Sequence, residues 1–171
     1  MTHKPLKRSL KFLVCVCSTS RYAAHGRCTT APEEDISGSI ATALIRDVGH
    51  AATYVLVSDD EHMIADVLEQ FLSGDRDVLV LVGGTGLAPS DITIEVAERY
   101  YQKHIVGFGE LFRQLSFEQV RTAAMLSRAS AGVCSRKVVF CIPGSPRATE
   151  LALSALILCE VGHILKHAEQ S

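Results

Sequence analysis

A glycine-rich segment combines residue types that suit phosphate binding with a carboxylate close behind them. Within DVLVLVGGTGLAPSD, residues 77–91, an apolar run breaks into GGTG at residues 83–86, and Asp91 follows. Glycine lets the backbone adopt positive φ and approach a ligand closely, so successive N–H groups can form a nest for an anion. Thr85 adds a hydroxyl donor, and an acid beside bound phosphates suits Mg²⁺, which prefers oxygen ligands. The segment therefore predicts a phosphate cradle with a metal-holding acid, and a tight strand-to-helix turn ordered by Asp91 is the alternative.

Small and polar residues also follow three other apolar runs, as STSR (18–21), SDDE (58–61) and PGSP (143–146). Ligands of open parallel sheets bind beyond the carboxyl ends of the strands, so these segments can meet the glycine segment around one polar ligand. Carboxylates from adjacent loops would bind a metal and orient a nucleophile. One of Asp59, Asp60 and Glu61 is equally expected to cap the next helix. Ser145 either faces the ligand at a helix N-terminus or simply initiates that helix.

The elements that must position these segments follow from hydrophobic periodicity. Short apolar runs rich in strand formers predict strands at residues 12–17, 53–57, 78–82, 130–134 and 137–142. Apolar residues that recur every three or four positions predict helices at about 36–48, 64–72, 93–103, 107–128 and 146–167. Residues 18–38 are predicted to be a long polar loop. Strands that alternate with helices and are apolar almost throughout predict a single α/β domain, with helices on both faces of a mostly parallel sheet. The strands at 130–134 and 137–142, joined by a two-residue turn, are predicted to form a short antiparallel pair.

Composition bounds the class of protein. The chain has 171 residues, of which 47% are apolar and 21% charged, and its net charge is −2. This composition is typical of an ordered globular protein and gives no basic field for nucleic acid. No apolar run of the length of a membrane span and no signal peptide is visible, so no membrane partner is expected. The six cysteines form no CxxC pair, and a reduced, cytoplasmic protein is expected.

Two further expectations concern the ends of the chain. The first is a basic N-terminal tail at residues 1–11, followed by one domain at residues 12–171. The second concerns His163 and His167, which lie four residues apart. No acid completes an HExxH motif around this pair, so a place on a helix surface is expected.

Five segments stand in an order that is more specific than any one of them. They are DISG (35–38), GGTGLAPSD (83–91), GFGELFRQLSF (107–117), LSRASAG (126–132) and IPGSP (142–146). Together they resemble the molybdenum cofactor biosynthesis family that includes MoaB, Mog and the first domain of plant and animal molybdopterin-inserting proteins. The segment GFGELFRQLSFEQ is most similar to the MoaB branch. The resemblance implies a molybdopterin-binding domain with a three-layer α/β/α, MoaB/Mog-like fold, assembled as a homotrimer or homohexamer.

The resemblance also implies an activity. Active members are similar to adenylyltransferases that use Mg²⁺ and ATP to convert molybdopterin into adenylyl-molybdopterin and pyrophosphate. The product is then passed to a metal-insertion protein. Molybdopterin, ATP, magnesium and that downstream protein are therefore the implied substrates, cofactor and partner. A non-catalytic molybdopterin-binding or scaffold oligomer of the MoaB branch is the alternative.

Roles for particular residues follow from the same resemblance. Asp60 and Asp91 would be the catalytic acids and metal ligands, and Asp59 stays an alternative to Asp60 because SDDE stands where active members commonly have proline-aspartate. The residues that would bind phosphate, nucleotide or pterin are Ser18, Asp35, Ser37, Gly38, Gly83, Gly84, Thr85, Gly86, Ser127, Arg128, Pro143, Gly144 and Ser145.

Overall fold

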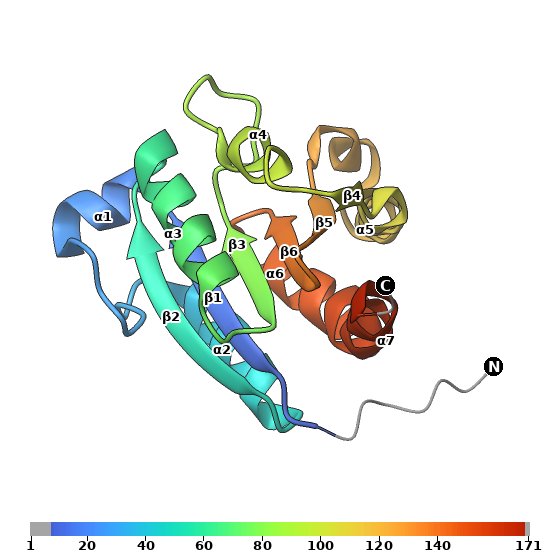
Figure 1. Cartoon of the computed structure of the whole chain (residues 1–171). Helices are drawn as coiled ribbons and strands as arrows, with labels where there is room; N and C mark the ends of the chain where they lie inside the picture. The colour runs from blue at the N-terminus through green and yellow to red at the C-terminus, as the bar shows by residue number, and fades with distance from the viewer. Residues whose placement is uncertain (1–7, 170–171) are drawn as a thin grey trace.

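A six-stranded sheet in the order β2-β1-β3-β6-β5-β4 forms the middle layer of the protein (Figure 1). The structure is a computed structural model and describes residues 8–169. The strands are β1 (Lys11–Cys17), β2 (Ala51–Val57), β3 (Val78–Val82), β4 (Lys103–His104), β5 (Ser130–Cys134) and β6 (Lys137–Ile142).

Four neighbouring strands, β2, β1, β3 and β6, run parallel, as their sequences predict. β1 pairs with β2 and β3, and β3 pairs with β6, all in parallel register. All five residues of β3 are buried, which explains why this strand is apolar throughout rather than alternating. β5 and β6 form the predicted antiparallel pair, joined by a turn at Ser135 and Arg136, both of which have positive φ. The mostly parallel sheet with a short antiparallel pair is confirmed.

Helices cover both faces of the sheet and divide the core in two. The helical elements are α1 (Thr19–His25), α2 (Ile36–Asp47), α3 (Glu61–Ser73), α4 (Thr93–Glu98), α5 (Val106–Val120), η1 (Arg121–Leu126), α6 (Pro146–Ala152), η2 (Leu153–Ile157) and α7 (Leu158–Glu169). One core contains side chains of α2, α5, α6 and α7, and the other those of α3 and α4. The three-layer α/β/α architecture is therefore confirmed.

Two elements differ from the sequence-based prediction. α1 forms inside the predicted polar loop 18–38, because the Ser18 side chain accepts a hydrogen bond from the Arg21 amide and so caps a short helix. α4 ends at Glu98 instead of near residue 103. The chain then extends along β5, where the Gln102 amide donates to the Val133 carbonyl at 2.9 Å and β4 begins one residue later. Pairing at the sheet edge therefore overrides the helical pattern there.

The last residues of the predicted basic tail contact the folded domain. Residues 1–7 lie outside the described part of the chain. Leu10 is only 1% exposed, and Arg8 forms an ion pair with Glu169 at 3.0 Å. Arg8 and Leu10 thus contact the folded domain.

The last helical stretch, Pro146–Glu169, is long and apolar enough to cross a membrane by length and composition alone. Its buried stripe of Leu153, Ile157, Val161 and Leu165 packs in the core against the sheet. A third of its apolar window is buried inside the molecule.

Candidate functional site

The loops that follow the parallel strands meet at one edge of the sheet. The Ser18 amide, directly after β1, donates to the Val57 carbonyl at the end of β2, at 3.0 Å. The Gly83 amide, directly after β3, donates to the Ile142 carbonyl at the end of β6, also at 3.0 Å. The predicted convergence of STSR, SDDE, GGTG and PGSP is thus a consequence of parallel strand order.

The first two glycines of GGTG adopt a conformation and a packing that exclude other residues. Gly83 has φ of 99°, and a Cβ there would lie 2.5 Å from the Cys17 carbonyl oxygen. Gly84 has φ of 62°, and its Cβ would overlap the Thr93 hydroxyl and lie 2.6 Å from Asp59 Oδ1. Positive φ together with close approach leaves glycine as the fitting residue at both positions. The loop backbone is therefore bare where it faces Asp59 and Thr93.

Asp59 and Thr93 each present a buried oxygen without a partner beside Gly84. Asp59 Oδ2 accepts hydrogen bonds from the Thr19 amide and hydroxyl, both at 2.9 Å. Asp59 Oδ1 and Thr93 Oγ1 are buried and accept or donate no hydrogen bond within the described residues. Buried polar atoms are costly when unpaired, and such atoms are usually satisfied by water, an ion or a ligand. These two oxygens therefore indicate a binding position at the glycine loop.

Asp60, the acid chosen from the resemblance, has a different place. It is the N-cap of α3, and its Oδ1 accepts a hydrogen bond from the Met63 amide at 3.0 Å. Its side chain thus pairs with an amide of the first turn of α3, which has no partner within the helix. This is the capping role that one acid of this segment was expected to take. Between the two alternatives, the geometry favours Asp59 as the acid that faces the glycine loop.

A cavity of about 330 Å³ brings together most of the predicted binding residues. Its lining residues are Gly83, Gly84, Thr85, Gly86, Asp91, Leu126, Ser127, Arg128, Pro143 and Gly144. The glycine loop, the segment before β5 and the loop after β6 therefore form one concave site. Of its lining, only Leu126 was absent from the predicted set.

Arg128 fixes the wall of this cavity. Its Nε donates to the Thr85 carbonyl at 2.9 Å, and its Nη2 donates to the Asp91 carbonyl at 3.2 Å. Its Nη1 donates a hydrogen bond to Glu95 of α4 and forms an ion pair with it. The hydrogen bond lowers the pKa of Glu95 from its ordinary value. A guanidinium held on three sides carries a fixed positive charge at the cavity.

Asp91 is held in turn by its own loop. Its Oδ2 accepts a hydrogen bond from the Ala88 amide at 2.9 Å, and the carboxylate packs against Gly86. The carboxylate thus lies beside the loop whose amides would receive an anion.

The remaining predicted residues lie around the cavity without lining it. Asp35 is fully buried as the N-cap of α2 and accepts hydrogen bonds from the Gly38 amide at 3.0 Å and the Tyr54 hydroxyl at 2.6 Å. Burial, and then the hydrogen bond to Asp35, raises the pKa of Tyr54 well above its ordinary value. The Ser37 hydroxyl donates to the Gly144 carbonyl at 2.7 Å, which ties DISG to PGSP. These residues hold the loops that line the cavity in place without lining it themselves.

Two serines predicted to bind a ligand act as helix caps. Ser145 caps α6 by accepting from the Ala148 amide at 3.2 Å, and Ser18 caps α1. Sequence reasoning missed Thr19 and Thr93, which contact or face the acids of the site. Both follow a predicted site residue by one or two positions, which was the available signal.

Comparison with known proteins identifies the class to which this fold and site belong. Residues 15–163 match a family described as a probable molybdopterin binding domain. The chain belongs to this family of molybdenum cofactor biosynthesis proteins, as the resemblance implied.

Several relatives of this chain are proteins of the B type. It is 46% identical over 139 residues to molybdenum cofactor biosynthesis protein B of Bacillus cereus, covering 80% of this chain and 82% of that protein. A crystal structure of a molybdenum cofactor biosynthesis protein B superposes with a TM-score of 0.85 at 38% identity, over 97% and 99% of the two chains. The tungsten cofactor synthesizing protein MoaB from Pyrococcus furiosus gives a TM-score of 0.83 at 35% identity, over 96% and 100%.

Proposed function

We propose that the protein binds molybdopterin in the 330 Å³ cavity and transfers AMP from ATP to its terminal phosphate. The observation that carries the proposal is a pair of buried oxygens, Asp59 Oδ1 and Thr93 Oγ1, that have no hydrogen-bond partner among residues 8–169. They do not line the cavity themselves but lie directly against Gly84, which does. Family membership supports the pterin as ligand, and the glycine nest supports its phosphate as the group received. The products would be adenylyl-molybdopterin and pyrophosphate.

The donor set at the glycine loop fits magnesium. Asp59, Asp91 and Thr93 offer oxygen atoms, which Mg²⁺ prefers. Among residues 8–169, no three His, Cys, Asp or Glu side chains form a metal cluster. Mg²⁺ is commonly held by one or two carboxylates together with substrate phosphates and water, so a shared site between Asp59 and Asp91 suits it. When bound, it would supply positive charge to the phosphate groups of both substrates.

In this reaction the main task of the protein is to bring two anions, the pterin phosphate and ATP, together. An oxygen of the pterin phosphate forms a bond to the α-phosphorus of ATP, the bond from that phosphorus to the bridging oxygen breaks, and pyrophosphate leaves with the electron pair. The attacking phosphate is ionised at neutral pH, so no strong general base is required. The amides of the glycine loop and the fixed guanidinium of Arg128 lower the repulsion between the reactants.

The test is pyrophosphate release from molybdopterin, ATP and MgCl₂ by the wild type and three matched variants. Asp59→Asn and Asp91→Asn keep the shape of each side chain and remove its charge. We expect each to lower kcat/KM by roughly 10²-fold or more, the scale of losing one electrostatic contact to a transition state. Asp60→Asn is the control, since asparagine caps a helix as well as aspartate does. It should retain activity within a few-fold of the wild type.

The outcomes separate the alternatives. A loss of activity in Asp60→Asn with normal activity in Asp59→Asn would return the catalytic role to Asp60. No turnover by the wild type, with molybdopterin binding that Gly84 substitution abolishes, would support the non-catalytic pterin-binding or scaffold protein instead. Circular dichroism of each variant shows whether it is folded.

We further propose that the protein works as a cytoplasmic homo-oligomer, a trimer or hexamer, that passes its product to a metal-insertion protein. The support is a group of exposed apolar side chains on α5, η1 and the loop after β3: Leu87, Val106, Leu111, Phe117, Val120, Met125 and Leu126. Met125 is 80% exposed, and leaving several such apolar side chains in water is unfavourable, whereas burying them between subunits would stabilise an oligomer. Light scattering after size-exclusion chromatography measures the mass, and a monomer at micromolar concentration would refute self-association.

A further inference from the structure

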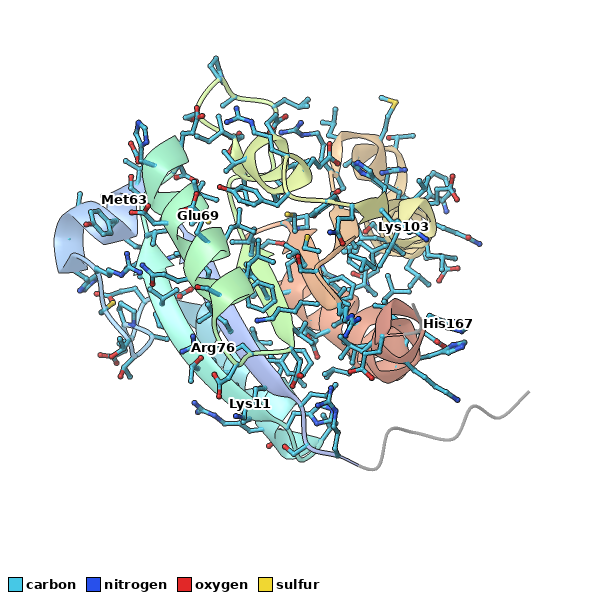
Figure 2. The ribbon with its side chains drawn as sticks, in the orientation of Figure 1. Lys11, Met63, Glu69, Arg76, Lys103 and His167 are labelled. Atoms are coloured by element: carbon cyan, nitrogen blue, oxygen red, sulfur yellow. The ribbon has the colours of Figure 1, made fainter. Side chains whose placement is uncertain are left out.

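Two histidines on α7 lie together at the end of the molecule opposite the proposed pterin cavity. The Nε2 atoms of His163 and His167 are 2.8 Å apart and share a hydrogen bond, and their ring centroids are 4.5 Å apart. Figure 2 shows His167 on α7 at the outer side of the molecule. α6 begins at the carboxyl edge of the sheet, and Glu169 at the end of α7 pairs with Arg8, just before β1. The pair is thus separated from the glycine loop by the length of the sheet.

The spacing of the two nitrogens matches that of neighbouring ligands on one ion. Imidazole nitrogens bind such ions at about 2.0–2.1 Å, so two of them lie about 2.9 Å apart at the right angle of a square-planar or octahedral ion, and about 3.3 Å apart at the tetrahedral angle of zinc. Histidines four residues apart on a helix share one face, the arrangement that zinc-binding helices use. His163 and His167 therefore already hold both Nε2 atoms at a metal-binding separation.

A neighbouring carboxylate sets up the donor atom of one ring. Glu160 Oε2 lies 3.5 Å from His163 Nδ1, on the side of the ring away from His167. A carboxylate there favours the tautomer with the proton on Nδ1, so Nε2 accepts the hydrogen bond from His167 and would bind a metal that displaces this bond. This is the carboxylate–histidine–metal arrangement in which the outer carboxylate orients the ligand.

The helix that carries the pair is fixed by its opposite face. Val161 and Leu165 alternate with the two histidines along α7, and each is only 1% exposed. Their packing in the core holds the backbone of α7 in place, so the two rings need little ordering on binding.

We propose that His163 and His167 form a binding site for one divalent transition-metal ion of the Ni²⁺, Cu²⁺ or Zn²⁺ class. Imidazole ligands suit these ions and not Mg²⁺, so the site is chemically distinct from the oxygen donors at the glycine loop. Because no third His, Cys, Asp or Glu of residues 8–169 joins the pair, the other coordination positions are filled by water or by a ligand from a second molecule. The inference does not depend on the proposed adenylyl transfer.

The experiment is a calorimetric titration of the full chain with Ni²⁺ in a weakly coordinating buffer containing excess Mg²⁺. We expect one Ni²⁺ per chain, and an affinity at least roughly tenfold lower in His163→Gln and in His167→Gln. Glu160→Gln should weaken binding by about tenfold or more, the usual effect of removing an outer carboxylate. Two controls, His62→Gln and Cys159→Ser, remove an exposed histidine on α3 and the exposed thiol of α7, and both should bind as the wild type does.

A second measurement locates the ion. Ni²⁺ is paramagnetic, and in ¹H–¹⁵N spectra it should broaden amide signals of α7 before those of the glycine loop. Affinity that is unchanged in both histidine variants, binding lost in either control, or broadening centred away from α7 would overturn the proposal.

Discussion

Three glycine-to-alanine substitutions separate the effects that shape the glycine loop. Gly107 in α5 has no positive φ and no heavy atom within 4 Å of an added Cβ. Gly49, after α2, has φ of 86° and equally open space. Gly84 has both positive φ and a Cβ position that overlaps Thr93 and approaches Asp59. The series therefore adds conformational strain first and steric overlap second.

The magnitudes follow from these differences. Gly107→Ala should be neutral or stabilise by up to about 1 kcal/mol, since alanine favours a helix. Positive φ strains alanine, and the lower conformational entropy of the unfolded alanine chain offsets part of that strain. Gly49→Ala should therefore lower the free energy of unfolding by about 1 kcal/mol. Gly84→Ala adds an overlap worth about 1–3 kcal/mol, for a total of about 2–4 kcal/mol. For a chain of this length each kcal/mol lowers Tm by about 2–4 °C.

Thermal unfolding followed by circular dichroism measures the series. The expected order of Tm is Gly107→Ala at or above the wild type, then Gly49→Ala, then Gly84→Ala lowest. If Gly84→Ala melts within about 2 °C of Gly49→Ala, the space around Gly84 yields easily and the close packing against Asp59 and Thr93 has no energetic weight.

Three other predictions test the support of the site and the core. Tyr54→Phe removes a hydrogen bond to the buried carboxylate of Asp35 and should cost about 1.5–3 kcal/mol in urea unfolding, whereas a loss under 0.5 kcal/mol would contradict it. Burial lowers the pKa of His50, whose Nδ1 accepts a hydrogen bond from the Leu10 amide, so the unfolded chain binds its proton more tightly than the folded chain. Stability should therefore be full above pH 6.5 and fall below it, and an NMR titration midpoint for His50 above 6.5 would refute this. Phe112→Ala should cost about 3–5 kcal/mol by calorimetry, because the ring is 1% exposed in the core, and a cost near 1 kcal/mol would show that the cavity collapses.

The parts of the fold that could be predicted are those where one local signal dominates. β3, β5 and β6 begin and end where the sequence predicts, because each is an apolar run bounded by glycine, proline or a tight turn. α1 and β4 were missed because each is short and is fixed by specific contacts: the Ser18 cap for α1 and pairing with the edge of β5 for β4. Such contacts are not visible as periodicity.

The candidate site shows the same division. Loops after parallel strands must share an edge, so the meeting of GGTG with PGSP was predictable. The choice between Asp59 and Asp60 was not, since both acids follow β2 and only the backbone path decides which one caps α3. The contacts of Arg128 with the Thr85 and Asp91 carbonyls also span about forty residues, and no pattern in the sequence marks them.

The helix caps at the carboxyl edge have a consequence for surface charge. Ser18, Asp35, Asp60 and Ser145 cap α1, α2, α3 and α6, and all four helices begin beside the loops of the site. The longer of these helices each contribute up to about half a positive charge at their first turn. The backbone supplies this charge, so it does not titrate and does not depend on surface lysines. Two of the four caps, Asp35 and Asp60, are carboxylates whose charge offsets that of their own helices, so only α1 and α6, capped by serine, keep the partial positive charge of their first turns.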